Sequence, residues 1–122
     1  MKVYIAGAHS RGRTLRVYLE TLYPDIQVEA FLVDDMADNA ETADGIPVQT
    51  IGDGLDTDSP VYVAMRSENR PKVIHELHLM GMKEIIPVTV ELDTELRNAY
   101  VRKYFQSLGR SFWLIDDLGI KG

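Results

Sequence analysis

The sequence predicts an α/β protein with an open, mostly parallel sheet of about five strands and helices on both faces. Short apolar runs alternate with segments in which apolar residues recur at helical spacing. The chain has 122 residues, of which 45% are hydrophobic and 26% charged, as in an ordinary globular domain. A single hydrophobic core of this size can fold alone.

The first predicted unit is β-α-β. Residues 3–6 form an apolar run that ends at Gly7, which is typical of a buried strand entering a turn. From Gly12 an apolar stripe at i, i+3, i+4 and i+7 predicts a helix that Pro24 stops. Residues 28–33 then form a second apolar run, as expected for a parallel strand that is buried on both faces.

The middle of the chain predicts a long polar loop over residues 36–45 and a short strand over 46–48. Pro47 places this strand near an edge, because proline cannot donate to a central ladder. Residues 60–65 form the next apolar strand. Asn69 is a candidate cap for the helix that follows, with Pro71 in its first turn and Gly81 at its end.

The last third predicts a strand over residues 85–88 and a helix over 92–108, with a further strand over 112–115. Strands that alternate with helices through right-handed crossovers give a Rossmann-like sheet. We therefore expect one Rossmann-like domain over residues 1–110. Residues 111–122 are expected to form a C-terminal strand and tail near a junction to a further domain.

Composition excludes several classes of function. The formal net charge is -6, which argues against a broad electrostatic grip on nucleic acid or on an anionic membrane. The chain has no cysteine, so thiolate metal sites and a cysteine nucleophile are excluded and a reducing compartment fits best. The apolar run at the start is too short for a signal peptide and no segment is long enough to span a bilayer, so we expect a cytoplasmic protein without membrane insertion.

The turn after the first strand is the first candidate site. In a parallel sheet, ligands bind beyond the carboxyl ends of the strands, and the N–H groups that open a helix attract anions such as phosphate. Gly7 and Gly12 match the outer glycines of the dinucleotide fingerprint, but His9 stands where its central glycine is expected. A glycine turn that serves close packing only is the alternative. The candidate binding residues here are Gly7, His9, Ser10, Arg11, Gly12 and Arg13.

Two further groups fall on the same predicted edge. Asp34 and Asp35 end the second strand, and Asp34 follows Gly12 by 22 positions, close to the spacing at which an acidic residue receives ribose hydroxyls. Arg66 and Arg70 flank the turn after the fourth strand and add two guanidinium groups. We expect Asp34→Ala and Arg13→Ala each to weaken nucleotide binding without unfolding the domain.

Other motifs favour structural interpretations. The Asp-x-Asp run at residues 56–58 precedes a strand, so we interpret it as a turn on the amino edge. His75 and His78 lack the spacing of a helical zinc motif and are interpreted as surface residues. The aromatic residues between Tyr100 and Trp113 are expected to pack a core or a subunit contact. We predict no catalytic residue and no metal site.

A family resemblance rests on several of these segments. The sequence resembles the N-terminal nucleotide-sugar-binding domain of bacterial sugar O-acyltransferases and related domains that precede polysaccharide-synthesis glycosyltransferases. The resemblance covers residues 2–88, and its most specific run is residues 44–48, Asp-Gly-Ile-Pro-Val. It implies that the turn from Gly7 to Arg13 receives a diphosphate and that Asp34 and Asp35 face the uridine of a UDP-sugar.

The leading hypothesis is a non-catalytic accessory domain that holds a UDP-sugar or related nucleotide for polysaccharide or lipopolysaccharide synthesis, with no covalent cofactor. An NAD(P)-dependent oxidoreductase or epimerase fragment is the enzymatic alternative, favoured by the spacing of Gly7, Gly12 and Asp34. A docking scaffold without a ligand is the third hypothesis. The expected partner is a small-molecule nucleotide-sugar, and a homo-oligomer or a fused glycosyltransferase domain is left open.

Overall fold

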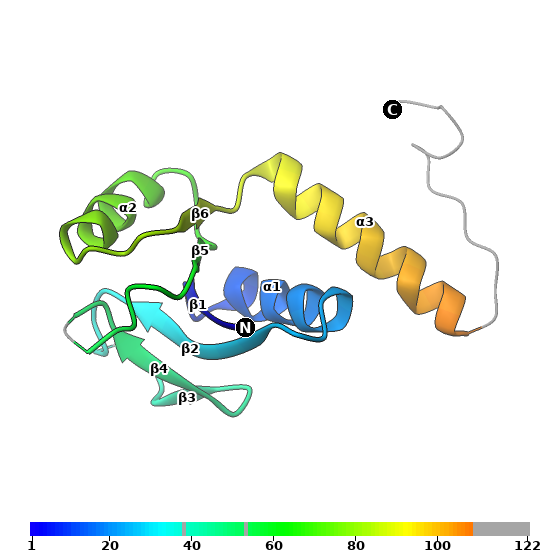
Figure 1. Cartoon of the computed structure of the whole chain (residues 1–122), viewed down its shortest axis with the longest axis horizontal. Coiled ribbons are helices and arrows are strands. Elements are labelled where there is room, and N and C mark those ends of the chain that lie inside the picture. The colour runs from blue at the N-terminus through cyan, green and yellow to red at the C-terminus, as the bar shows by residue number, and fades with distance from the viewer. Residues whose placement is uncertain (38, 53, 109–122) are drawn as a thin grey trace.

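A computed structural model describes residues 1–37, 39–52 and 54–108 of the chain (Figure 1). Strands and helices alternate through most of this part. The strands are β1 (Lys2–Ala6), β2 (Gln27–Val33), β3 (Thr42–Ala43), β4 (Ile46–Thr50), β5 (Val61–Val63) and β6 (Ile85–Pro87). The helices are α1 (Ser10–Leu22), α2 (Arg70–Leu79) and α3 (Val90–Ser107).

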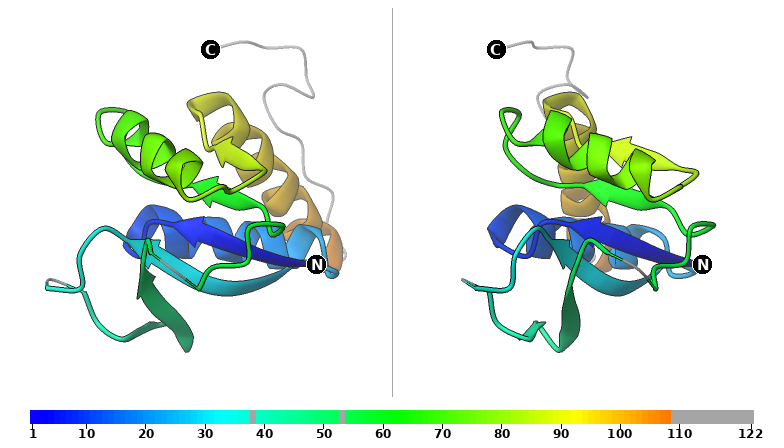
Figure 2. Two further views of the ribbon diagram at one scale, coloured as in Figure 1. Left: turned by 60° about the vertical axis from the view of Figure 1, so that its left-hand side comes forward. Right: turned by 90° about the vertical axis from the view of Figure 1, so that its left-hand side faces the viewer.

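The six strands form one mixed sheet in the order β3-β4-β2-β1-β5-β6. Every neighbouring pair is parallel except β3 and β4, which form an antiparallel hairpin. Figure 2 shows this hairpin and β6 at opposite ends of the sheet. The chain first extends the sheet from β1 toward β4 and then returns to the other side of β1, so the direction of growth reverses between β1 and β5. The α/β class and the mostly parallel sheet are confirmed.

Helices cover both faces of the sheet, as the sequence predicts. On one face Leu15 and Leu19 of α1 and Leu96 of α3 pack on strand residues that include Ile5 and Phe31. On the other face Val73 and Leu77 of α2 pack on residues that include Leu32 and Val63. The helices α1 and α3 also contact each other. Both faces of the central strands are therefore buried, which explains their nearly continuous apolar sequences.

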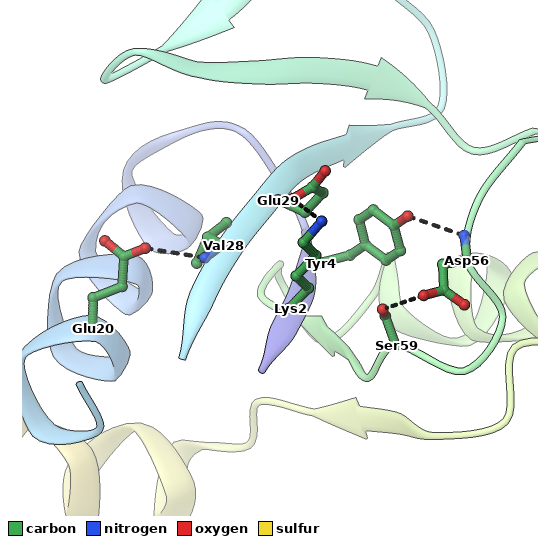
Figure 3. Close-up of polar contacts among 7 residues, drawn as sticks. All are labelled: Lys2, Tyr4, Glu20, Val28, Glu29, Asp56 and Ser59. Atoms are coloured by element: carbon green, nitrogen blue, oxygen red, sulfur yellow. Dashed lines mark hydrogen bonds and ion pairs between the residues drawn. The ribbon is translucent and has the colours of Figure 1, made fainter. Parts of the chain in front are cut away.

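A β-bulge in β2 sets which residues face each helix layer. Val3 pairs with Val28 but Tyr4 pairs with Ala30, which leaves Glu29 as the extra residue. The bulge places Val28 and Phe31, three positions apart, on the same face. Glu20 of α1 accepts a hydrogen bond from the Val28 N–H at 3.0 Å (Figure 3). The carboxylate of Glu20 therefore provides an acceptor for a backbone N–H at the bulge, where the sheet is irregular.

The strand count differs from the prediction of about five, because β3 lies inside the segment that the sequence predicts as a polar loop. It has only two residues and turns directly into β4 through Asp44 and Gly45, which both have positive φ angles of 52° and 79°. An Asp-Gly pair favours this two-residue hairpin. Pro47 pairs with Thr42 of β3, whereas the pairing with β2 begins at Val48, so proline stays out of the central ladder.

The helix ends agree with the prediction in part. Helix α1 begins at Ser10 rather than at Gly12. Asn69 precedes α2, but its side chain makes no capping hydrogen bond, so the predicted cap is wrong in its chemistry. Gly81 follows α2 with a φ of 85°, as expected for a glycine that ends a helix. Thr89, which was not predicted as a cap, accepts a hydrogen bond from the Leu92 N–H at the start of α3.

The predicted strand over residues 112–115 and the tail to residue 122 lie outside the described residues. In the part of the chain that the structure describes, no helix is long and apolar enough to cross a membrane.

Candidate functional site

The turn between β1 and α1 and the first turn of α1 are packed so tightly that each needs a glycine, Gly7 in the turn and Gly12 in the helix. Gly7 has a φ of 121°, and its N–H donates to the carbonyl of Leu32 in the neighbouring β2. A Cβ atom at Gly7 would lie 2.4 Å from the carbonyl oxygen of Ala64, and one at Gly12 would lie 1.9 Å from the carbonyl oxygen of Gly7. The turn is therefore pressed between the carboxyl ends of β2 and β5.

The same turn presents the start of α1. His9 is extended and its side chain does not cap the helix. The first intrahelical hydrogen bond of α1 runs from the Arg13 N–H to the carbonyl of His9. The N–H groups of Ser10, Arg11 and Gly12 precede it, so they have no acceptor within the helix and can donate to an anion.

A cleft of about 810 Å³ opens beside this helix start. Three segments supply most of its walls: residues 7–12 of the turn, residues 32–35 at the end of β2, and residues 64–66 after β5. Asn39, Ile51, Asn69 and Val73 complete the lining. The cleft thus lies at the carboxyl edge of the sheet, next to the point between β1 and β5 where the strand order reverses.

Eight of the ten residues predicted to bind a ligand line this cleft. They are Gly7, His9, Ser10, Arg11, Gly12, Asp34, Asp35 and Arg66. The carboxyl-edge rule predicted this convergence, since the residues come from three segments far apart in the sequence. The rule also applies to Ile51 and Met65, which follow β4 and β5 and were not predicted as site residues.

Arg13 lies outside the cleft, in contrast to the expectation that it joins the diphosphate region. Its guanidinium donates from Nε to Oδ2 of Asp44 at 3.0 Å and from Nη2 to Oδ1 at 2.8 Å. This hydrogen bond is the main cause of the lowered pKa of Asp44. Desolvation opposes it, and the charges of Arg13 and Arg16 lower the pKa further. Arg13 lines a separate hollow with the β3–β4 hairpin. The helical turn directs it away, because it is one residue further along α1 than the last cleft residue, Gly12.

Arg70 also lies outside the cleft and lines a neighbouring hollow of about 290 Å³. Its Nη1 donates to the carbonyl of Val88 at 3.2 Å. The two cavities share Arg11, Ala64, Met65 and Arg66 as common walls. Arg70 therefore stands next to the cleft on the far side of Arg66 rather than inside it.

The two aspartates at the end of β2 have different surroundings. Asp35 is held by its own loop, since its Oδ1 accepts from the Ala37 N–H and its carbonyl accepts from Nδ2 of Asn39. Asp34 faces α2, where Nζ of Lys72 lies 4.0 Å from its Oδ2. The carboxylate of Asp35 thus shapes the loop and that of Asp34 is the more available acceptor.

Glu76 of α2 joins the surroundings of Asp34. Desolvation raises the pKa of Glu76, and the hydrogen bond and negative charge of Asp34 raise it further. Lys72 lies 3.9 Å from Glu76 and opposes this rise. Lys72 therefore lies within 4.0 Å of two carboxyl groups, those of Asp34 and Glu76.

The motifs interpreted as structural agree with the structure. Oδ1 of Asp56 accepts from the Asp58 N–H, so this Asp-x-Asp run is a turn. Oδ2 of Asp56 also accepts from Oγ of Ser59 (Figure 3). His75 and His78 are exposed on α2. Among the described residues, no group of three His, Cys, Asp or Glu side chains is placed to hold a metal ion.

The aromatic region forms a row on α1 and α3. Tyr18 contacts Tyr100 with ring centroids 5.2 Å apart, and Tyr104 continues the row at 6.5 Å from Tyr100. Trp113, the last aromatic residue of this region, lies outside the described residues.

The fold and the cleft together define an α/β protein with a ligand-sized site at the carboxyl edge of its sheet. The chain matches no family model, no curated protein and no solved structure.

Proposed function

We propose that this chain is a non-catalytic binding module that holds a nucleotide, and in particular a nucleotide-sugar such as a UDP-sugar, in the cleft. The order of the parallel strands supports a Rossmann-like assignment. Counted along the chain without the β3 strand, the parallel strands lie in the order 3-2-1-4-5. The first five strands of doubly wound nucleotide-binding sheets have the same order. The ligands of these sheets bind at the point where the strand order reverses.

The observation that carries the proposal is the meeting of three segments at that point. A glycine turn with free helix N–H groups, a carboxylate after β2 and an arginine after β5 line one cleft. Each of these features is common when it occurs alone. Their combination provides donors for phosphate and an acceptor for hydroxyl groups within one cavity of a size typical for small molecules.

The two halves of a nucleotide suit different walls. Phosphate oxygens would accept from the N–H groups of Ser10 and Gly12, with Arg11 and Arg66 supplying positive charge. Ribose hydroxyls would donate to Asp34, whose carboxylate is exposed at the end of β2. Apolar groups of Ile51 and Val73 offer a surface for the base.

His9 departs from the dinucleotide fingerprint. In the dinucleotide fingerprint the central glycine allows the backbone to approach the pyrophosphate closely. Here His9 carries an imidazole at that position and lines the cleft. Nicotinamide dinucleotides are therefore the competing ligands that a test must include. Binding without chemistry is proposed because both acidic side chains of the cleft already have other roles. Asp35 is held by its own loop, and Asp34 is the acceptor for the ribose. The association with polysaccharide synthesis comes from the family resemblance.

The test is a thermal-shift panel on the full chain with UDP, UDP-glucose, other nucleotide-sugars, NADH and coenzyme A, followed by calorimetry on any ligand that raises the melting temperature. Binding to the native state stabilises by mass action. We expect UDP or a nucleotide-sugar to shift the melting temperature and NADH to leave it unchanged.

Two variants locate the site. Arg11→Gln and Asp34→Asn should each weaken the binding by about tenfold, which corresponds to one charge-assisted hydrogen bond. Asp25→Asn is the matched control, because Asp25 is exposed and lies outside the cleft. A shift by NADH alone would favour the oxidoreductase alternative. No shift by any nucleotide at millimolar concentration would overturn the proposal in favour of a docking scaffold.

A further inference from the structure

The hollow beside the cleft has the size and position of a second compartment. Its volume is about 290 Å³, against about 810 Å³ for the cleft. Arg11 and Arg66 form part of the wall of both. A ligand whose phosphate lies at Arg11 can therefore extend past these two side chains into the hollow. The volume of the hollow is at the lower end of the range for small-molecule sites.

Arginine is the main charged residue of this hollow. Arg11, Arg66 and Arg70 line it together with the carboxylates of Glu68 and Asp93. Arg11 and Arg66 make no ion pair among the described residues 1–37, 39–52 and 54–108. The chain as a whole is acidic, with 19 Asp and Glu against 13 Lys and Arg. In this hollow the balance is reversed, with three arginines against two carboxylates.

Arg70 is held in place before any ligand arrives. Its side chain is half-buried, and its Nη1 donates to the Val88 carbonyl at 3.2 Å. This contact uses one of the five N–H donors of the guanidinium and holds the group against the segment between β6 and α3. A guanidinium held in this way loses little freedom when it binds, and its planar donor set matches a carboxylate in a bidentate arrangement.

We infer that this hollow receives the sugar of the bound nucleotide-sugar and selects a sugar that carries a carboxylate, a uronic acid. The inference rests on the proposed function. Arg70, assisted by Arg66, binds the carboxylate of the sugar. The side chains of Glu68 and Asp93, which line the same hollow, accept hydrogen bonds from the hydroxyl groups of the sugar.

Calorimetry with UDP, UDP-glucose and UDP-glucuronate tests this inference on the full chain. The two sugar nucleotides differ only at C6, where one carries a hydroxymethyl group and the other a carboxylate. We expect UDP-glucuronate to bind about tenfold more tightly than UDP-glucose. Arg70→Gln should abolish this preference and leave the affinity for UDP unchanged, since Arg70 does not line the cleft.

Two further variants separate binding from stability. Arg70→Lys keeps the charge but not the planar fork, so it should retain only part of the preference. Arg97→Gln removes a charge from α3 outside both cavities and should retain all of it. Thermal unfolding of each variant shows that it is folded before its affinity is interpreted.

The outcomes distinguish the two proposals. If UDP binds and the two sugar nucleotides bind equally, the second compartment is overturned and the nucleotide site stands. The same holds if the preference for UDP-glucuronate survives in Arg70→Gln. If none of the three ligands binds, the proposed function fails and this inference fails with it.

Discussion

Arg13 and Asp44 join helix α1 to the β3–β4 hairpin through two parallel hydrogen bonds of 3.0 and 2.8 Å. Asp44 has two structural roles at once. It is the first residue of the two-residue turn, with a positive φ of 52°, and its carboxylate is the partner of Arg13. Its carbonyl also accepts from Nη1 of Arg16. The run from Asp44 to Val48, which carried the most specific part of the resemblance, is therefore a fixed structural unit in this fold.

Breaking this pair should destabilise the protein in a pH-dependent way. The hydrogen bond from Arg13 lowers the pKa of Asp44 in the folded protein, so the pair stabilises the fold at neutral pH and this contribution is lost as the pH falls through the folded-state pKa. We expect Asp44→Asn to lower the midpoint of urea unfolding at pH 7, and the difference from the wild type to vanish in acid. Asparagine also tolerates the positive φ, so the change isolates the charge.

A double-mutant cycle supplies the control. Arg13→Gln should be destabilising in the wild type and nearly neutral in the Asp44→Asn background, because the partner is then absent. Since Arg13 lies outside the cleft, Arg13→Gln should change the affinity of any bound nucleotide by less than about twofold. A tenfold loss would show that Arg13 leaves Asp44 to contact the ligand, as predicted from the sequence.

The glycines of the β1–α1 turn are expected to be intolerant of even one methyl group. Gly12→Ala would place a Cβ atom 1.9 Å from the carbonyl oxygen of Gly7, a backbone atom that cannot move without shifting β1. We expect a loss of about 3 kcal/mol or more in the free energy of unfolding, measured by urea denaturation. Gly7→Ala should be similar, because it combines a positive φ with a contact of 2.4 Å to Ala64.

Gly52→Ala is the matched control for both variants. Gly52 follows β4, has no positive φ, and a Cβ atom there would meet its nearest neighbour, Oγ1 of Thr50, only at 4.0 Å. Its stability should stay within about 0.5 kcal/mol of the wild type. A mild effect of Gly12→Ala would contradict the tight packing of the turn.

The order of elements could be predicted because each element has its own local signal. The apolar runs around Ile5 and Phe31 and the helical stripe of Leu15 and Leu19 are patterns of period and composition, and they are buried as expected. The hairpin strand β3 could not be recognised in this way, because two residues have no period. The Asp-Gly pair that follows is typical of a two-residue hairpin, but no hairpin was predicted from it.

The site could be predicted as far as the backbone decides it. The carboxyl-edge rule located Asp34 and Arg66 at one cleft, because strand ends are fixed by topology. The directions of Arg13 and Arg70 depend on long side chains and on partners that are distant in sequence, Asp44 and Val88. No local pattern contains that information.

The bulge in β2 should depend on Glu20. Oε2 of Glu20 accepts from the Val28 N–H at 3.0 Å, so Glu20→Ala leaves a half-buried donor without its protein acceptor. We expect a loss of about 1 to 2 kcal/mol in the free energy of unfolding. Glu20→Gln keeps an acceptor oxygen and should cost less. Glu95→Ala, which removes an exposed carboxylate from α3, is the control and should cost least. Equal effects of all three substitutions would show that Val28 does not need Glu20.

Glu76 should make the protein less stable as the pH rises through the acidic range. Desolvation and the neighbouring Asp34 raise its pKa above the ordinary value of 4.5, so the folded state binds a proton that the unfolded state has already released. This contribution is complete below the unfolded-state pKa and is lost as the pH rises through the folded-state pKa. Relative to the wild type, Glu76→Gln should therefore gain stability between acid and neutral pH, measured as the difference in urea midpoints at several pH values.

A variant of Asp34 tests the cause of the raised pKa of Glu76. Because the carboxyl group of Asp34 causes part of the rise, the pH-dependent gain from Glu76→Gln should shrink in an Asp34→Asn variant, whereas the part caused by desolvation should remain. Lys72 opposes the rise, so Lys72→Gln should enlarge the gain. A gain that is independent of both neighbours would show that Glu76 is not electrostatically linked to Asp34 or to Lys72. In that case, the affinity for a nucleotide whose ribose bonds to Asp34 should also be unchanged by Glu76→Gln.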